Sequence, residues 1–186
     1  MGRKKIIVLT ALGAAAAAWL HYRSSIPKNA VPVKPFDVNR YLGKWYEIAR
    51  LDYFFENKLN NTSAEYSLNT DGSVQVLNQG YNYKTAEWKQ ATGKAKFVAD
   101  TNEGKLKVSF FGPLYSGYNV IALDNNYQYA LVAGRNLDYL WLLSRERTMP
   151  ATVIEDYLQK ARQLGYDTSK LLWVEQNGLL TSSAAV

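Results

Sequence analysis

Alternation of apolar and polar side chains dominates the middle of the chain and predicts β-strands. In residues 62–68, for example, Ala64, Tyr66 and Leu68 share one face, because successive side chains of a strand point to opposite sides. The period recurs in 43–50, 74–78, 91–97, 106–110, 118–123, 127–133 and 137–144, with turn residues between them. Eight short strands with brief connections predict an all-β, antiparallel up-and-down barrel, whose closure removes the sheet edges. A two-sheet sandwich is the alternative.

Residues 149–164 change to a helical period. Val153, Ile154, Tyr157, Leu158, Ala161 and Leu164 fall on one face, and charged side chains take the other. Pro150 lies near the start, and Gly165 is placed to cap the end. This pattern predicts one C-terminal α-helix packed outside the sheet, followed by a short strand over 171–174.

The two ends of the chain differ from this pattern. Arg3-Lys4-Lys5 precedes Ile6 to Leu20, fifteen residues without a charge, and this order is typical of a secretory signal. As a helix the run would span about 22 Å, short of the roughly 30 Å of a bilayer core. We therefore interpret residues 1–22 as an export signal or N-terminal membrane anchor rather than an internal helix. Residues 23–35 are interpreted as a linker, 36–176 as the folded domain and 177–186 as a flexible tail.

The composition excludes several kinds of chemistry. Of the 22 basic residues, six lie in residues 1–35, where no acid occurs, so the other 151 residues hold 16 of each sign. The net charge of +6 therefore does not indicate nucleic-acid binding by the domain. The chain has no cysteine, and its one histidine, His21, precedes the domain. Disulfides, thiolate or histidine metal sites and serine–histidine triads are thus excluded there, and we expect no cofactor. Glu47 is better explained as a hydrogen-bonded structural carboxylate than as a base.

The interior of the barrel is the best candidate site, since eight strands can leave room for one small ligand. The alternation places Trp45, Glu47 and Ala49 on one face of the first strand. Tyr53-Phe54-Phe55, in the connection that follows, would lie at a pocket mouth, touch a membrane or fold onto the barrel end. The expected ligand-binding wall consists of Ala64, Tyr66, Val76, Asn78, Leu106, Val108, Phe110, Asn119, Ile121, Ala130, Val132, Tyr139 and Trp141. Small residues at inward positions favour a hollow over a filled barrel: Ala64, Ala91, Gly93, Ala95 and Ala130. An apolar wall with a few polar groups suits an amphiphile.

Three ordered blocks resemble the lipocalin family. Gly43-Lys44-Trp45-Tyr46-Glu47 is similar to its G-x-W motif, and 118–124 with 129–132 resembles its second block. Leu143-Ser144-Arg145 lies where the family keeps an arginine stacked on the motif tryptophan. The longer stretches 43–50, 107–113 and 139–145 look like the bacterial outer-membrane lipocalins of the Blc type, which are similar to apolipoprotein D. The resemblance covers about residues 36–176.

This resemblance implies an eight-stranded calyx that binds fatty acids or lysophospholipids for storage or transport in envelope membrane maintenance. It implies that Trp45 plugs the closed end and that Arg145 covers its ring, both as structural residues of the barrel base. It implies a bacterial outer-membrane or periplasmic location. The outer-membrane members carry a lipidated cysteine, which this chain lacks, so membrane association would use the leader; otherwise the domain would be secreted.

Two functions stay open at this point. The first is a lipid-binding protein, and the second is a calyx enzyme resembling the isomerases or de-epoxidases of the family. The missing cysteine and histidine count against the enzyme. Formation of a homodimer is left open by the sequence.

Overall fold

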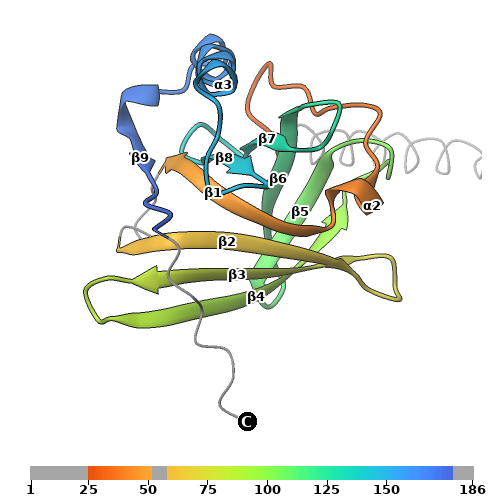
Figure 1. The fold of residues 1–186 in the computed structure, drawn as a ribbon. Coiled ribbons are helices and arrows are strands. Elements are labelled where there is room, and N and C mark those ends of the chain that lie inside the picture. The colour runs from red at the N-terminus through yellow and green to blue at the C-terminus, as the bar shows by residue number, and fades with distance from the viewer. Residues whose placement is uncertain (1–24, 52–57, 178–186) are drawn as a thin grey trace, which may run out of the picture.

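The computed structural model describes residues 25–51 and 58–177. They form an antiparallel sheet in the order β2-β3-β4-β5-β6-β7-β8-β1-β9, which closes because β1 also pairs with β2 (Figure 1). The predicted barrel is confirmed. The strands are β1 (Gly43–Leu51), β2 (Leu59–Leu68), β3 (Val74–Asn82), β4 (Glu87–Phe97), β5 (Lys105–Phe111), β6 (Leu114–Leu123), β7 (Tyr129–Ala133), β8 (Leu140–Ser144) and β9 (Leu171–Trp173).

The predicted C-terminal helix is α3 (Ala151–Gln163), which packs outside the barrel beside β7 and β8 (Figure 1). Its buried side chains are Tyr157 and Ala161, and the Tyr157 hydroxyl donates to the carbonyl of Tyr129 at 2.9 Å. Gly165 has the left-handed φ of 95° that ends the helix, as predicted. A short 3-10 helix, η1 (Thr168–Lys170), leads into β9.

One helix was not predicted. The single turn α2 (Val38–Tyr41) begins at Asp37, whose carboxylate accepts a hydrogen bond from the amide of Asn39. It lies at one end of the barrel, at the opposite side from β9 (Figure 1). Tyr41 is buried there, so α2 covers what we call the closed end.

The first strand forks at the other, open end. Residues 43–46 of β1 pair with β2, whereas Ala49–Leu51 pair with β9. The Gln176 amide bridges the gap, donating to the carbonyls of Glu47 and Thr62 at 2.8 Å each. The chain after β9 thus ties the two diverging strands together.

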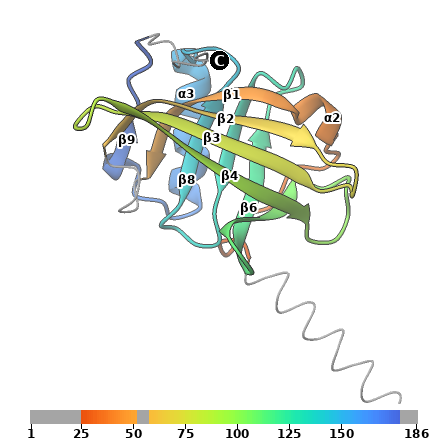
Figure 2. The ribbon, with the colours of Figure 1, turned by 90° about the horizontal axis from the view of Figure 1, so that it is seen from below.

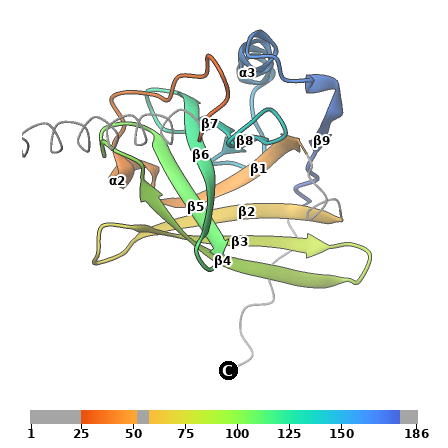
Figure 3. The same ribbon diagram turned by 180° about the vertical axis from the view of Figure 1, so that it is seen from behind.

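A second separation lies between β4 and β5. The long strands β2, β3 and β4 lie side by side across one face (Figure 2), and β5 and β6 descend onto β4 (Figure 3). Yet β4 pairs with β5 only from Lys94 to Phe97, although β4 begins at Glu87. Just before this paired segment, the Phe110 ring packs against Gly93, where an added Cβ atom would clash with the ring.

The described part of the expected linker is folded onto the barrel. We call residues 25–35 the strap. Its Val33 exchanges backbone hydrogen bonds with Val120 and Gly104, and a side chain at Gly117 would collide with the carbonyl of Ser25. Residues 25–35 are therefore part of the domain's packing. The expected leader (1–22) and the tail beyond residue 177 lie outside the described residues. Within 25–51 and 58–177, no helix is long and apolar enough to cross a membrane.

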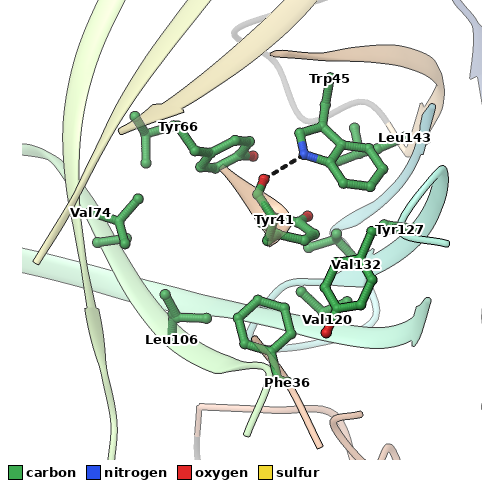
Figure 4. Packing of buried hydrophobic residues seen from close by; sticks show 13 residues of the cluster. Phe36, Tyr41, Trp45, Tyr66, Val74, Leu106, Val120, Tyr127, Val132 and Leu143 are labelled. Atoms are coloured by element: carbon green, nitrogen blue, oxygen red, sulfur yellow. Dashed lines mark hydrogen bonds between the residues drawn. The ribbon is translucent and has the colours of Figure 1, made fainter. Parts of the chain in front are cut away.

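Two apolar clusters lie on opposite faces of the sheet. The outer cluster packs α3 against the outside of the barrel and includes Leu131, Leu140 and Leu142. The inner cluster fills the closed end around Trp45, with Phe36 and Tyr41 from the chain entering the barrel (Figure 4). The closed end is therefore a core of aromatic rings.

Arg145 covers the ring of Trp45, as the resemblance to lipocalins implies. Its guanidinium carbon lies 4.0 Å from the centre of the Trp45 ring. It also donates to the carbonyls of Lys44 and Arg40, both at 2.8 Å, and of Tyr127 at 3.2 Å. The indole nitrogen of Trp45 donates to the carbonyl of Tyr41 at 2.8 Å (Figure 4). The Arg145 side chain thus joins the chain that enters the barrel, β1 and the turn before β7.

Replacing Arg145 should destabilise the whole barrel. We expect Arg145→Ala to lower the free energy of unfolding by about 2–3 kcal/mol, because a cation–π contact and charged hydrogen bonds are lost. Arg145→Lys should recover less than half of this, since an ammonium cannot reach three carbonyls. Urea denaturation measures both. Arg147, whose guanidinium lies over the Tyr46 ring at 5.2 Å and is exposed, provides the control; an equal loss in Arg147→Ala would contradict the prediction.

Candidate ligand-binding site

Most of the predicted wall faces the interior. Nine of the thirteen residues belong to the inner cluster or pack against it: Ala64, Tyr66, Val76, Leu106, Val108, Phe110, Ala130, Val132 and Trp141. Asn78 shares the phase of Val76 on β3 and lies opposite Ala64 on β2 and Ala91 on β4. The alternation along β2, β3, β5 and β7 was therefore read in the correct phase.

The phase predicted for β6 is wrong, and Asn119 and Ile121 do not face the interior. Tyr118 and Val120 take the inner positions, and Ile121 belongs to the outer cluster. The Asn119 amide donates to the carbonyls of Ser25, Ala133 and Gly134 at 2.9–3.2 Å. Asn119 therefore fixes the strap to the outside of the sheet instead of orienting a ligand.

Tyr139 precedes β8 and stacks on a wall residue. Its ring centre lies 6.2 Å from that of Trp141, with 20° between the planes. The carbonyl of Tyr139 accepts from Tyr166 at 3.2 Å and from the amide of Gly134 at 3.0 Å. Tyr139 is thus held at the end of the loop between β7 and β8, half-buried and stacked on the inward-facing Trp141.

A bulge in β1 brings a charged pair inside, which the sequence analysis missed. The register against β8 shifts between Glu47 and Ala49. Ala49 consequently lies in the outer cluster, contrary to the predicted face, and Arg50 takes the inner position. Arg50 is 1% exposed and its guanidinium lies 2.5 Å from the carboxylate of Glu47. Glu47 is hydrogen-bonded to Arg50, as the interpretation of it as a structural carboxylate expects.

Arg50 lies among other polar groups near the open end. It is paired across the sheet with Trp141, and its Nη2 lies 3.4 Å from the carbonyl of Leu59. Thr62 follows on β2 in the phase of Ala64, and its methyl group lies against Gly80. The Thr62 hydroxyl is buried without a hydrogen-bond partner among the described residues. Buried polar groups are nearly always satisfied, so such a group is a candidate ligand contact.

Three tyrosine hydroxyls meet deeper in the barrel. The Tyr118 oxygen lies 2.7 Å from that of Tyr41 and 2.7 Å from that of Tyr66. Burial raises the pKa of all three phenols, which keeps them neutral. Three hydroxyl protons serve two hydrogen bonds, so one proton is left to donate elsewhere. The tyrosines separate the polar open half from the packed floor.

The closed end has no room for a ligand. Its enclosed cavity of about 10 Å³ is lined by apolar and aromatic side chains that include Phe36, Tyr41 and Leu106. That space holds a single water at most, so the expected hollow does not extend to the floor. Toward the open end the inward-facing Ala64, Asn78 and Trp141 are only half-buried, and Ala91 is exposed.

The described residues offer little for metal chemistry. Nowhere in 25–51 and 58–177 do three histidine or acidic side chains form a group that could hold a metal ion. The aromatic run Tyr53-Phe54-Phe55 lies outside the described residues. The candidate site therefore consists of the mostly apolar inner wall and the buried Glu47–Arg50 ion pair near the open end.

Comparison with known proteins places the chain in a family. The family described as "Lipocalin-like domain" matches residues 36–176. The chain belongs to the lipocalin family. It is 48% identical to "Outer membrane lipoprotein Blc" of Escherichia coli (strain K12) over 174 residues, covering 92% of this chain and 98% of that protein. It is 35% identical to "Apolipoprotein D" of Macaca fascicularis over 148 residues, or 76% of this chain and 77% of that one.

The fold of this lipocalin is shared with solved structures. Insecticyanin from the tobacco hornworm Manduca sexta superposes with a TM-score of 0.65 at 23% identity, over 80% of this chain and 85% of that one. At this identity the likeness shows the fold alone. The resemblance inferred from Trp45 and Arg145 is thereby confirmed for the family, and their packing accounts for the closed end.

The tyrosine hydroxyls predict how stability depends on pH. Their pKa values lie above the ordinary 10.0 in the folded protein, so the unfolded chain releases these protons first. Stability is therefore fully present below about pH 10 and falls as pH rises toward the folded-state values. In Tyr118→Phe the free energy of unfolding should fall less steeply with pH, by up to about 1.4 kcal/mol per pH unit, because one buried hydroxyl is removed.

Urea denaturation at pH 9, 10 and 11 measures this slope. The exposed Tyr83 gives a matched control, because Tyr83→Phe should leave the slope unchanged. Identical slopes in Tyr118→Phe and the parent protein would show that the buried hydroxyls do not control alkaline stability.

Proposed function

We propose that this lipocalin binds an amphiphilic lipid, a fatty acid or a lysophospholipid, in the open half of its barrel and stores or carries it in the cell envelope. One observation carries the proposal: the mostly apolar inner wall bears a buried arginine, paired with Glu47, and a buried Thr62 hydroxyl that has no hydrogen-bond partner among the described residues. An anionic or zwitterionic head group is complementary to such a position.

The two polar levels of the barrel decide the orientation of the lipid. At the tyrosine level, burial disfavours charge, as the raised pKa values of the phenols indicate. A carboxylate or phosphate would suffer the same desolvation there. At the level of Arg50 the ion pair with Glu47 makes the surroundings more polar, and a guanidinium there can offset part of that cost. We therefore place the head group near Arg50 and the acyl chain between Trp141, Val108 and the tyrosines.

The length of β1 limits the depth of the site. Arg50 follows Trp45 by five steps along the strand, which is at most about 16 Å at roughly 3.3 Å per residue. Part of that depth is occupied by the packed closed end. An acyl chain that extends inward from Arg50 therefore has less than this length available, and the rest of the head group lies toward the mouth.

The names of the relatives support a place in the envelope. The Escherichia coli relative is named an outer membrane lipoprotein, and it aligns with 92% of this chain. Because this chain has no cysteine, we propose that residues 1–22 export the protein, or retain it at a membrane, without lipidation of a cysteine. The relatives described above are named as lipoproteins rather than enzymes, and no feature of the barrel favours the alternative of a calyx enzyme.

Removing the interior charges should remove selectivity for anionic head groups. In Glu47→Gln/Arg50→Gln we expect the affinity for a long-chain fatty acid to fall about tenfold, and that for the monoacylglycerol of equal chain length to change less than twofold. Native mass spectrometry of the titrated full chain measures both. The exposed Glu87–Lys89 pair at 2.5 Å is the matched control, since Glu87→Gln/Lys89→Gln should change neither affinity. Equal losses for the two lipids would overturn the head-group assignment.

Two alanines separate loss of binding from loss of stability. Ala64 is half-buried on the inner wall, where it is paired with Trp45 of β1, whereas Ala130 is 0% exposed in the packed inner cluster. We expect Ala64→Trp to abolish lipid binding while lowering the melting temperature less than Ala130→Trp does. Ala130→Trp should instead lower stability by about 1–3 kcal/mol through overpacking. Thermal melts and lipid titrations on both variants test this, and undiminished binding by a folded Ala64→Trp would contradict the proposed site.

A further inference from the structure

The hairpin between β5 and β6 carries an exposed apolar tip. We define this tip as residues 111–115. Phe111 and Leu114 are 82% and 77% exposed and are paired across the hairpin, so their side chains form one patch. Gly112 and Pro113 between them are also exposed. Large apolar side chains gathered at a projecting tip usually mark an interaction surface.

A lysine face adjoins the tip on the outside of the barrel. It consists of Lys94, Lys96 and Lys107 around Tyr115. The ammonium groups of Lys96 and Lys107 lie 6.0 and 5.4 Å from the centre of the Tyr115 ring. Only Lys94 has an acidic partner among the described residues, Asp71 at 2.7 Å. The face therefore keeps a net positive charge.

The register of the strands adds a second argument for an external anion. Lys96 and Lys107 are directly opposite each other on β4 and β5. Like charges in this arrangement destabilise a sheet, so the pair opposes folding unless an anion offsets it. The residues from Val108 to Leu123 contain no charge at all, so the apolar tip and the basic face are sharply divided.

We propose that the tip and the lysine face together dock the protein onto a membrane surface that contains anionic phospholipid. Phe111 and Leu114 would enter the interface between head groups and acyl chains, and the lysines would contact phosphates. A second copy of the chain is a poor occupant, because a two-fold contact through this surface would bring two lysine faces together. The proposal does not depend on the cargo of the barrel.

The absence of cysteine makes a local test straightforward. A single Leu114→Cys variant of the full chain can be labelled at one site with a polarity-sensitive fluorophore. Leu68→Cys is the matched control, since Leu68 is an exposed leucine, 48% accessible, at the end of β2 near the closed end. The labelled proteins are mixed with vesicles of phosphatidylcholine alone or with one quarter phosphatidylglycerol.

We expect the Leu114 probe to shift to the blue and gain intensity severalfold with the anionic vesicles, and the Leu68 probe to remain nearly unchanged. Adding Lys96→Gln and Lys107→Gln should weaken the response about 10- to 30-fold in lipid concentration, because each lysine near an anionic surface contributes about a factor of five. Lys96 is exposed and Lys107 half-buried, and removal of their opposed like charges should not lower the melting temperature. A melting temperature at or above that of the parent excludes misfolding as the cause.

Three results would overturn the proposal. A silent Leu114 probe would show that the tip stays in water, even if residues 1–20 bind the vesicles. Equal responses at Leu114 and Leu68 would show attachment without a preferred face. A dimer in gel filtration with light scattering that is lost in Phe111→Ser/Leu114→Ser would assign the tip to a second copy. Failure of any of these kinds leaves lipid binding inside the barrel untouched, because that is measured by titration without vesicles.

Discussion

The stacking of Arg145 on Trp45 is the contact on which the barrel depends. Trp45 is completely buried, and its ring is covered on one face by a guanidinium 4.0 Å away. The same guanidinium binds carbonyls before β1, at its start and before β7. A barrel needs its first and last strands to meet, and here β1 meets β8 and β2 at the level of this contact. Closure and the aromatic core are thus fixed by the same two side chains.

Where a strand has no bulge, the alternation in the sequence predicts correctly which side chains face the interior of the barrel. The phases of Ala64 and Tyr66 on β2, and of Leu106 and Val108 on β5, are correct because one face must be apolar and no residue is inserted. The helix over 151–163 was equally accessible from its period. The single turn α2 was not, since four residues give too little periodicity to recognise.

Bulges explain most of what the sequence could not show. An extra residue in one strand moves every later side chain to the other face. In β1 the shift between Glu47 and Ala49 brings Arg50 inside, which hid the charged group of the candidate site. In β6 the predicted phase is wrong by one position up to Ile121, and the register shifts between Val120 and Ala122, so that no single alternation describes the whole strand. Asn119 looked like a polar wall residue because its partners are backbone carbonyls of distant segments, which leave no sequence pattern.

The two halves of the barrel are built for different tasks. At the closed end, aromatic rings fill the space down to about 10 Å³ and the strands are paired on both sides of β1. At the open end, β1 parts from β2, and β4 pairs with β5 over only four residues. A change in width there disturbs the contact of Phe110 with Gly93 but breaks no ladder hydrogen bond between these strands. Because the closed end is held by backbone hydrogen bonds, side chains at the open end can shift without breaking the barrel. The buried Arg50 lies at this open end, where its charge needs polar neighbours rather than the apolar packing of the core.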